Sequence, residues 1–191
     1  YFVSKQQTKD IKIVEQMHRV RLLLTRIAEI SALNPAAKPA DRAAALVNLG
    51  DWYFINNKPG TAVENYKQAY QLLAANESDR VVLKKLFDKP VRIPVMTTAL
   101  PGAVDDIPSD AVTPPYVRLS FDVSKDGRAK NIEVIAESEP TSIRARKTAK
   151  QLIQSSIFRP QMREGEPVAT QATELLLSGA VLQNGAVQDS Y

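Results

Sequence analysis

The chain has 191 residues, no cysteine and a formal net charge of +4. This length allows one domain or two small ones, and the lack of cysteine excludes disulfides, CxxC redox chemistry and thiolate metal sites. Lysine and arginine are spread along the chain rather than gathered among aromatic residues, so nucleic acid is not an expected partner. No apolar run reaches the roughly 20 residues that span a bilayer. Because the first residue is Tyr1 rather than Met, a removed signal peptide and a preceding membrane anchor both stay open.

Residues 10–33 have the apolar spacing of a long helix. The apolar positions recur at intervals of three and four: Ile13, Met17, Val20, Leu23, Leu24, Ile27 and Ile30. Asn34-Pro35 predicts the end of the helix, because the residue before a proline avoids the helical region. We expect this helix to pack in a bundle, with a coiled-coil or dimer seam as the alternative.

Two shorter helices are predicted next, over residues 39–56 and 61–75, with a turn at Asn57-Lys58-Pro59-Gly60 between them. Six residues of this pair stand at the consensus spacing of a tetratricopeptide repeat: Leu49, Gly50, Tyr53, Ala62, Tyr66 and Ala69. The segment therefore resembles that family. Small residues at Gly50, Ala62 and Ala69 let helices cross closely, and the tyrosines fill the space between them. Leu46 and Ala74 depart from the consensus Trp and Pro.

The ends of this helical region resemble incomplete repeats. Residues 30–35 are similar to the end of a preceding repeat, and residues 77–87 are expected to form a capping helix. One good repeat, half of another and a cap fall short of the roughly three repeats that a solenoid needs to bury its faces. The module should therefore pack on the C-terminal unit or on a partner.

Residues 89–115 are rich in proline and contain six of the 12 prolines. Such chain is extended and semi-rigid, which predicts a linker. The apolar residues 91–96 leave open whether this part is a free spacer or an ordered strand. Asp105, Asp106 and Asp110 lack the spacing of metal ligands, so solvated acids are expected there and no metal site.

The C-terminal part begins with the clearest strand of the sequence. Val117, Leu119, Phe121 and Val123 alternate with polar residues, which indicates one buried face. Lys125-Asp126-Gly127-Arg128 predicts a two-residue hairpin turn, in which Asp-Gly supplies the positive backbone angles. A return strand is expected over residues 129–137.

A helix follows Pro140, with its apolar face formed by Ala145, Ala149, Leu152 and Ile153, and closes at Phe158-Arg159-Pro160. The basic residues between Arg144 and Lys150 are interpreted as a solvated face rather than a nucleic-acid or lipid contact. A turn at residues 164–167 then leads into a last strand within residues 168–181.

This order of elements resembles the C-terminal domain of the TonB family. Three stretches support the resemblance: VRLSFDVSKDGRAKNIEVI, the helix that ends in IFRP, and REGEPV before an apolar strand. The signature residues are Phe121, Asp126, Gly127, Phe158, Arg159 and Pro160. The chain departs from the family in having helical repeats, where a transducer has an anchor helix and a long Pro-rich spacer.

The resemblance implies a periplasmic domain of a Gram-negative envelope protein that binds outer-membrane receptor peptides and uses proton-motive force from an inner-membrane motor. The last strand would bind such a peptide by strand addition at the sheet edge. The edge residues expected to do so are Thr173, Glu174, Leu175, Leu176, Leu177, Ser178 and Gly179. Membrane contact would come through an anchor ahead of Tyr1.

Catalysis has little support in the sequence. His18 is the one histidine and lies among arginines on the first helix, where a surface role is expected. Glu137 and Glu139 are neighbours only in sequence, and P-loop, GxGxxG and HExxH motifs are absent. We expect no enzyme activity and no cofactor.

The predicted fold class is α+β: all-α tetratricopeptide-like hairpins, then a small domain with a three-stranded antiparallel sheet and one or two helices. The predicted domains are residues 1–88, a linker over 89–115, and residues 116–191. Two functions stay open: a TonB-like energy transducer with a repeat module for protein contacts, and a soluble periplasmic adaptor of a transport or secretion complex. An anchor before Tyr1 would favour the first, and a cleaved signal peptide the second.

Overall fold

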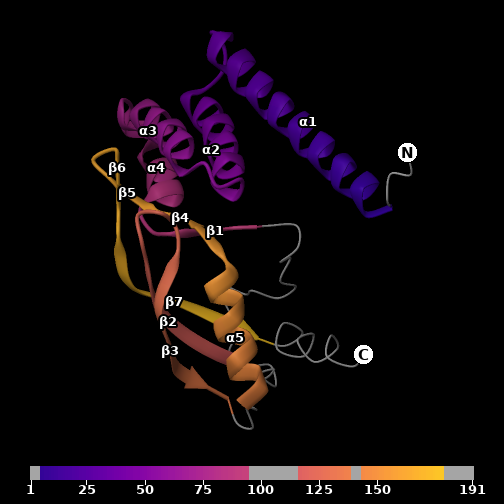
Figure 1. Cartoon of the computed structure of the whole chain (residues 1–191). Coiled ribbons are helices and arrows are strands. Elements are labelled where there is room, and N and C mark those ends of the chain that lie inside the picture. The colour runs from indigo at the N-terminus through magenta and orange to yellow at the C-terminus, as the bar shows by residue number, and fades with distance from the viewer. Residues whose placement is uncertain (1–4, 95–115, 139–142, 179–191) are drawn as a thin grey trace. The chain divides into compact units, whose positions relative to one another are not determined.

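A computed structural model describes the backbone of residues 5–94, 116–138 and 143–178, with side chains from residue 15 onward. The chain divides into two compact units, residues Tyr1–Leu86 and Phe87–Tyr191 (Figure 1). The predicted α+β class is confirmed: a region of packed helices precedes a three-stranded antiparallel sheet with a helix. The predicted linker lies largely outside the described residues, since residues 95–115 are not among them.

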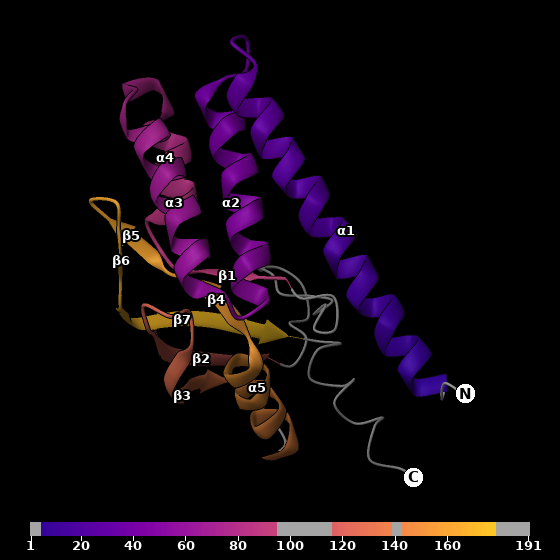
Figure 2. The ribbon, with the colours of Figure 1, turned by 45° about the horizontal axis from the view of Figure 1, so that its top comes forward.

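The first unit is built from α1 (Lys5–Leu33), α2 (Pro39–Ile55), α3 (Pro59–Ala74), the short 3-10 helix η1 (Glu77–Asp79) and α4 (Arg80–Phe87). The last residue of α4 falls in the second unit. The single capping helix expected over residues 77–87 is thus divided into η1 and α4. Helix α2 packs against α1 on one side and α3 on the other (Figures 1 and 2).

The turn between α2 and α3 follows from its sequence. Asn57 has a positive φ of 57°, a conformation that asparagine tolerates better than most residues. The Lys58 N–H donates to the Tyr53 carbonyl and the Asn57 N–H to that of Phe54, which is the Schellman pattern of a helix C-terminus. Pro59 then occupies the first turn of α3, where its missing N–H costs no hydrogen bond.

The second unit contains β1 (Val91–Ile93), β2 (Tyr116–Val123), β3 (Ala129–Glu137), α5 (Ile143–Ser155), β4 (Ile157–Arg159), β5 (Gln161–Arg163), β6 (Glu166–Val168) and β7 (Thr170–Ser178). The main sheet has the order β3-β2-β7, and Figure 2 shows these three strands side by side. Helix α5 packs on β3 and β2. Val117, Leu119, Phe121 and Val123 are buried, as their alternation predicts, and pack with Ala149 and Ile153 of α5.

Two short pairs of strands accompany the main sheet. β1 pairs antiparallel with β4, so residues 91–93 form the ordered strand that was one of the two alternatives for this segment. β5 and β6 form a hairpin, with positive φ at Glu164 and Gly165 as a tight turn requires. Neither pair has enough residues to show a period in the sequence.

Three local predictions are corrected by the structure. Helix α5 ends at Ser155, and residues 157–159 are the strand β4 rather than the end of the helix. The last strand begins later than predicted and is separate from β6, since β6 ends at Val168 and β7 begins at Thr170. The β2–β3 turn has a positive φ only at Gly127, and the Gly127 N–H donates to the Ser124 carbonyl. This is a type I turn followed by a left-handed glycine, not the predicted two-residue turn.

Candidate functional site

The candidate site is centred on β7, which lies at an end of the main sheet. Its described partner in that sheet is β2, with Leu175 opposite Leu119 and Leu177 opposite Val117. A strand at the end of a sheet presents a row of backbone N–H and C=O groups to an incoming chain. These groups can bind any extended peptide, whatever its side chains.

Side chains of β7 alternate between two environments. Leu177 is fully buried, and Leu175 packs against the same core on the α5 face of the sheet. Glu174 and Leu176 lie opposite Ser120 and Arg118 on the other face. The inner side chains therefore hold β7 in the sheet, and among the described strands only β2 pairs with β7, so its other edge has no described partner strand.

The beginning of β7 is shaped by Asp122 of β2. The backbone N–H of Ala172 donates to Asp122 Oδ1 at 3.1 Å, and Asn131 Nδ2 donates to Asp122 Oδ2 at 2.7 Å. The Asn131 hydrogen bond, followed by that of Ala172, lowers the pKa of the Asp122 carboxyl. Ala172 has a φ of 50°, and the register of β2 with β7 shifts between Phe121 and Val123. The regular open edge thus begins after this irregularity, at Thr173.

A groove of about 550 Å³ runs beside this part of β7. Its lining comes from the segment around β1, from two core phenylalanines and from the first residues of β7: Lys89, Pro90, Val91, Arg92, Phe121, Phe158, Thr170, Gln171, Ala172, Thr173, Glu174 and Leu175. The Phe121 and Phe158 rings are 5.2 Å apart between centroids. The groove therefore has an aromatic base with charged residues, such as Lys89 and Glu174, in its lining.

Two polar groups in the groove wall bear on what it can bind. Thr173 Oγ1 is buried and has no hydrogen-bond partner within the described residues. Arg92 Nε donates to Ser156 Oγ at 2.9 Å, and Ser156 Oγ donates to the Leu152 carbonyl at 2.7 Å. Burial lowers the pKa of the Arg92 guanidinium, although arginine stays charged at any ordinary pH. This chain of bonds fixes the β1 wall to the end of α5.

Comparison with known proteins gives one match. Residues 115–175 match the family model of the Gram-negative bacterial TonB protein C-terminal. The chain contains a TonB C-terminal domain. The match covers about a third of the chain. No curated protein and no solved structure is similar enough to be reported.

The TonB C-terminal domain implies a TonB-like role with outer-membrane receptors, and it points to the periplasm. The family is non-catalytic. Among the described residues, no helix has the length and apolar character needed to cross a membrane. Nothing identifies the helices of the first unit as tetratricopeptide repeats.

The signature residues of the TonB C-terminal domain meet in one place. The Phe158 N–H donates to the Gly127 carbonyl at 3.0 Å, and Arg128 forms a bridge with Ile157. Phe158 packs on Phe121, while Arg159 and Pro160 are buried and Asp126 is exposed in the turn. The glycine turn and the FRP motif thus support each other, although 30 residues separate them. These contacts stabilise the fold of the second unit, and Phe121 and Phe158 also line the base of the groove.

The predicted edge residues Thr173, Glu174, Leu175, Leu176, Leu177 and Ser178 all lie in β7, and Gly179 is outside the described residues. The groove wall at residues 89–92 and the hydrogen bond between Asp122 and Ala172 were not predicted from the sequence. The apolar character of residues 91–96 was the one sequence signal for the wall. The polar contact of Asp122 with Ala172 joins residues 50 positions apart and had no signal.

The other predicted residues form a helical interface in the first unit. Ala62, Tyr66 and Ala69 are fully buried, Leu49 and Gly50 are buried, and Tyr53 is half-buried. The Tyr66 hydroxyl donates to Asp51 Oδ1 at 2.7 Å. His18 lies on α1, with its Nδ1 3.2 Å from Arg21 Nη2. Asp105, Asp106 and Asp110 are outside the described residues.

Proposed function

We propose that the second unit binds an extended segment of an outer-membrane receptor by strand addition to β7. The observation that supports this most is the combination of a sheet-end strand with a groove along its inner side. The incoming backbone pairs with the open edge from Thr173 onward, which contributes affinity with little dependence on sequence. The bound segment becomes a fourth strand next to β7.

The groove then supplies selectivity. Alternate side chains of an added strand point to the inner face, where Phe121 and Phe158 favour an apolar group. The Thr173 hydroxyl offers a hydrogen bond to the same segment.

We further propose that the domain transmits force to the receptor, as an energy transducer. A strand that is pulled along its own axis loads all its backbone hydrogen bonds together, so the added strand is suited to this role. An adaptor that only holds the receptor would use the same edge. Receptor-mediated uptake in cells separates the two roles. If the domain is a transducer, a variant that no longer binds the receptor should lose uptake that depends on the proton-motive force. If it is only an adaptor, the same variant should keep that uptake.

A proline at Leu176 tests strand addition. Leu176→Pro should abolish binding of a synthetic peptide from the N-terminal segment of an outer-membrane receptor, measured by titration calorimetry, because proline disturbs the edge backbone. Ile135→Pro is the matched control. Ile135 lies at a register irregularity of β3, the strand at the opposite end of the sheet, where proline is better tolerated.

The peptide provides a second arm that does not depend on the fold of the variant. N-methylation of alternate peptide residues should abolish binding for the set whose N–H groups face β7 and spare the other set. Equal effects of the two sets, or unchanged affinity of a folded Leu176→Pro variant, would contradict strand addition.

For the first unit we propose a tetratricopeptide-like module for protein contacts. Gly50 supports this, since α3 comes so close that an added Cβ would lie 2.5 Å from the Tyr66 ring. A groove of about 500 Å³ lies between α1, α2 and α3 and includes Arg42, Leu46 and Leu72. The test is whether the full chain binds a receptor-bound or motor protein. Loss of this binding in Leu72→Glu, with binding kept in the exposed Val81→Glu, would support the module. Equal loss would contradict it.

A further inference from the structure

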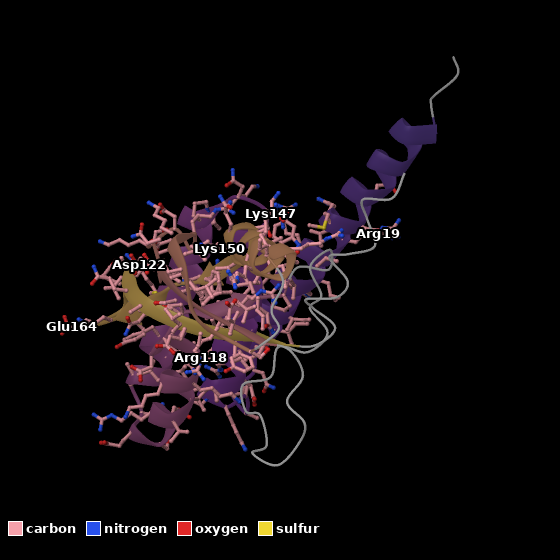
Figure 3. The ribbon with its side chains drawn as sticks, turned by 90° about the horizontal axis from the view of Figure 1, so that it is seen from below. Arg19, Arg118, Asp122, Lys147, Lys150 and Glu164 are labelled. Atoms are coloured by element: carbon pink, nitrogen blue, oxygen red, sulfur yellow. The ribbon has the colours of Figure 1, made fainter. Side chains whose placement is uncertain are left out.

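The carboxylate of Asp122 joins β2 to both of its neighbouring strands. Its Oδ1 accepts a hydrogen bond from the N–H of Ala172 in β7 at 3.1 Å, and its Oδ2 accepts one from Asn131 Nδ2 in β3 at 2.7 Å. Both partners have a left-handed backbone, with a φ of 50° at Ala172 and 51° at Asn131. The register of β2 shifts beside Asp122 against each neighbour, and Figure 3 labels Asp122 close to β7. One carboxylate therefore holds an irregularity in each strand.

The two irregularities depend on Asp122 to different degrees. Asparagine tolerates a positive φ because its short polar side chain forms local hydrogen bonds, whereas alanine has no such group. A left-handed alanine in a strand persists only where its surroundings hold it. The described contact that does so is the hydrogen bond from the Ala172 N–H to Asp122. Without that carboxylate we expect Ala172 to return to extended backbone, whereas Asn131 can keep its positive φ.

The irregularity at Ala172 is a bulge with a defined place on β7. Between Thr170 and Thr173, residues 171 and 172 together face Asp122 alone. A bulge of this kind bends its strand and interrupts the ladder. Thr173 is the first residue after the bulge, and it lines the groove with a buried hydroxyl that has no hydrogen-bond partner within the described residues. The bulge thus determines which residue begins the regular edge.

We propose that Asp122 sets the register in which a receptor segment adds to β7. This role rests on the strand addition proposed above. Backbone pairing does not depend on side chains, so a regular edge would let the segment slide by two residues and keep the same hydrogen bonds. The bulge ends the regular edge at Thr173 and leaves one register in which the ladder is complete.

A fixed register gives the groove its selectivity. Alternate residues of the segment face the inner side of the sheet, and the register decides which of them meets Thr173 and the aromatic base at Phe121 and Phe158. Asp122 itself is not among the residues that line the groove. It acts through the backbone of Ala172 and is a positioning residue.

Disulfide trapping measures the register in the full chain. The chain has no cysteine, so Leu176→Cys places a single thiol on β7, at the residue opposite Arg118. Synthetic peptides from the N-terminal segment of an outer-membrane receptor each carry one cysteine, at alternate positions, so that each reports a register two residues from the next. Under mild oxidation the Leu176→Cys chain should cross-link to one peptide at least about tenfold faster than to its neighbours in the series, because a disulfide requires Cβ atoms about 4 Å apart.

Loss of the bulge should remove this preference. In Asp122→Ala the ratio of rates should fall below about threefold, since the segment can then slide along the edge. Asp122→Asn keeps an oxygen acceptor for the Ala172 N–H and should retain the preference. Asn131→Gly is the matched control and should also retain it, because this change removes the other hydrogen bond of Asp122 while glycine keeps the positive φ available.

Two substitutions at Ala172 separate positioning from a general loss of stability. Ala172→Val should broaden the register although Asp122 is present, because a β-branched residue disfavours a positive φ. Ala172→Gly should restore the preference to Asp122→Ala, because glycine adopts that φ without support. The amide spectrum of each full-length variant shows whether β2 and β7 are still paired.

The proposal is overturned if a folded Asp122→Ala chain keeps the tenfold preference, or if the Leu176→Cys chain itself cross-links equally to peptides two residues apart. Where Asp122→Ala does not fold, Ala172→Val decides, and an unchanged preference in that variant overturns the proposal. Failure of every peptide to cross-link to Leu176→Cys, together with no binding in calorimetry, would instead contradict strand addition itself.

Discussion

Alanine at Gly50 should destabilise the helical unit, although alanine is the better helix former. A Cβ at this position would lie 2.5 Å from Tyr66 Cε1, 2.8 Å from Tyr66 Cδ1 and 3.2 Å from the Ala62 carbonyl oxygen. The ring has little room to move, because Tyr66 is fully buried and its hydroxyl is held by Asp51. The helices themselves would have to separate.

The magnitude follows from three opposing terms. Replacing glycine by alanine in a helix gains about 1 kcal/mol. Overpacking costs about 1 to 3 kcal/mol, and a disturbed Tyr66–Asp51 hydrogen bond adds about 1 kcal/mol. The net loss should be about 1 to 3 kcal/mol, which lowers the midpoint of a unit of this size by roughly 4 to 24 °C.

Trp52 gives the assay. It is the one tryptophan of the chain and lies on α2, so its fluorescence follows the unfolding of the helical unit in urea. Gly60→Ala is the matched control, because no atom lies within 4 Å of the added Cβ and the same substitution should leave stability unchanged or raise it. If Gly50→Ala stabilised the unit as much as Gly60→Ala does, the close contact between α2 and α3 would be refuted.

Two further predictions concern the second unit. The hydrogen bonds of Asp122 lower the pKa of its carboxyl in the folded chain. The ionised carboxylate should therefore contribute its full stabilisation above the unfolded pKa, near 3.9. This stabilisation should disappear as the pH falls through the lower folded pKa. The difference in thermal midpoint between the parent chain and Asp122→Asn should therefore shrink on acidification below about pH 4, and a constant difference would show that the charge is unimportant. Gly127→Ala should lower the free energy of unfolding by about 1 kcal/mol, because the residue has a φ of 65°. Urea unfolding followed by circular dichroism measures this. Gly127→Asn should lower it less, and equal losses for the two variants would show that φ is not the cause.

Much of the fold could be predicted where a residue pattern reports its own environment. The alternation over residues 117–123 predicts β2 because one face of that strand is buried. The Asn-Lys-Pro-Gly turn predicts the break between α2 and α3 because its residues suit that local geometry. The TonB-like order of turn, helix and FRP motif led to the correct domain.

Other features depend on partners that are far away in sequence. The end of α5 was predicted too late because residues 157–159 pair with β1, more than 60 residues earlier. The same pairing brings residues 89–92 to the groove, and the contact of Asp122 with Ala172 sets where the regular part of β7 begins. The apolar spacing of α1 was visible, but the division of its side chains between two faces required the position of α2.

Amide chemical shifts of the full, isotope-labelled chain offer the most direct measurement of the central claim. On titration with an outer-membrane receptor peptide, we predict the largest changes at residues 173–178. Intermolecular nuclear Overhauser contacts should join the peptide backbone to β7. Changes centred on β3 or on the helical unit, with residues 173–178 unaffected, would contradict strand addition at β7.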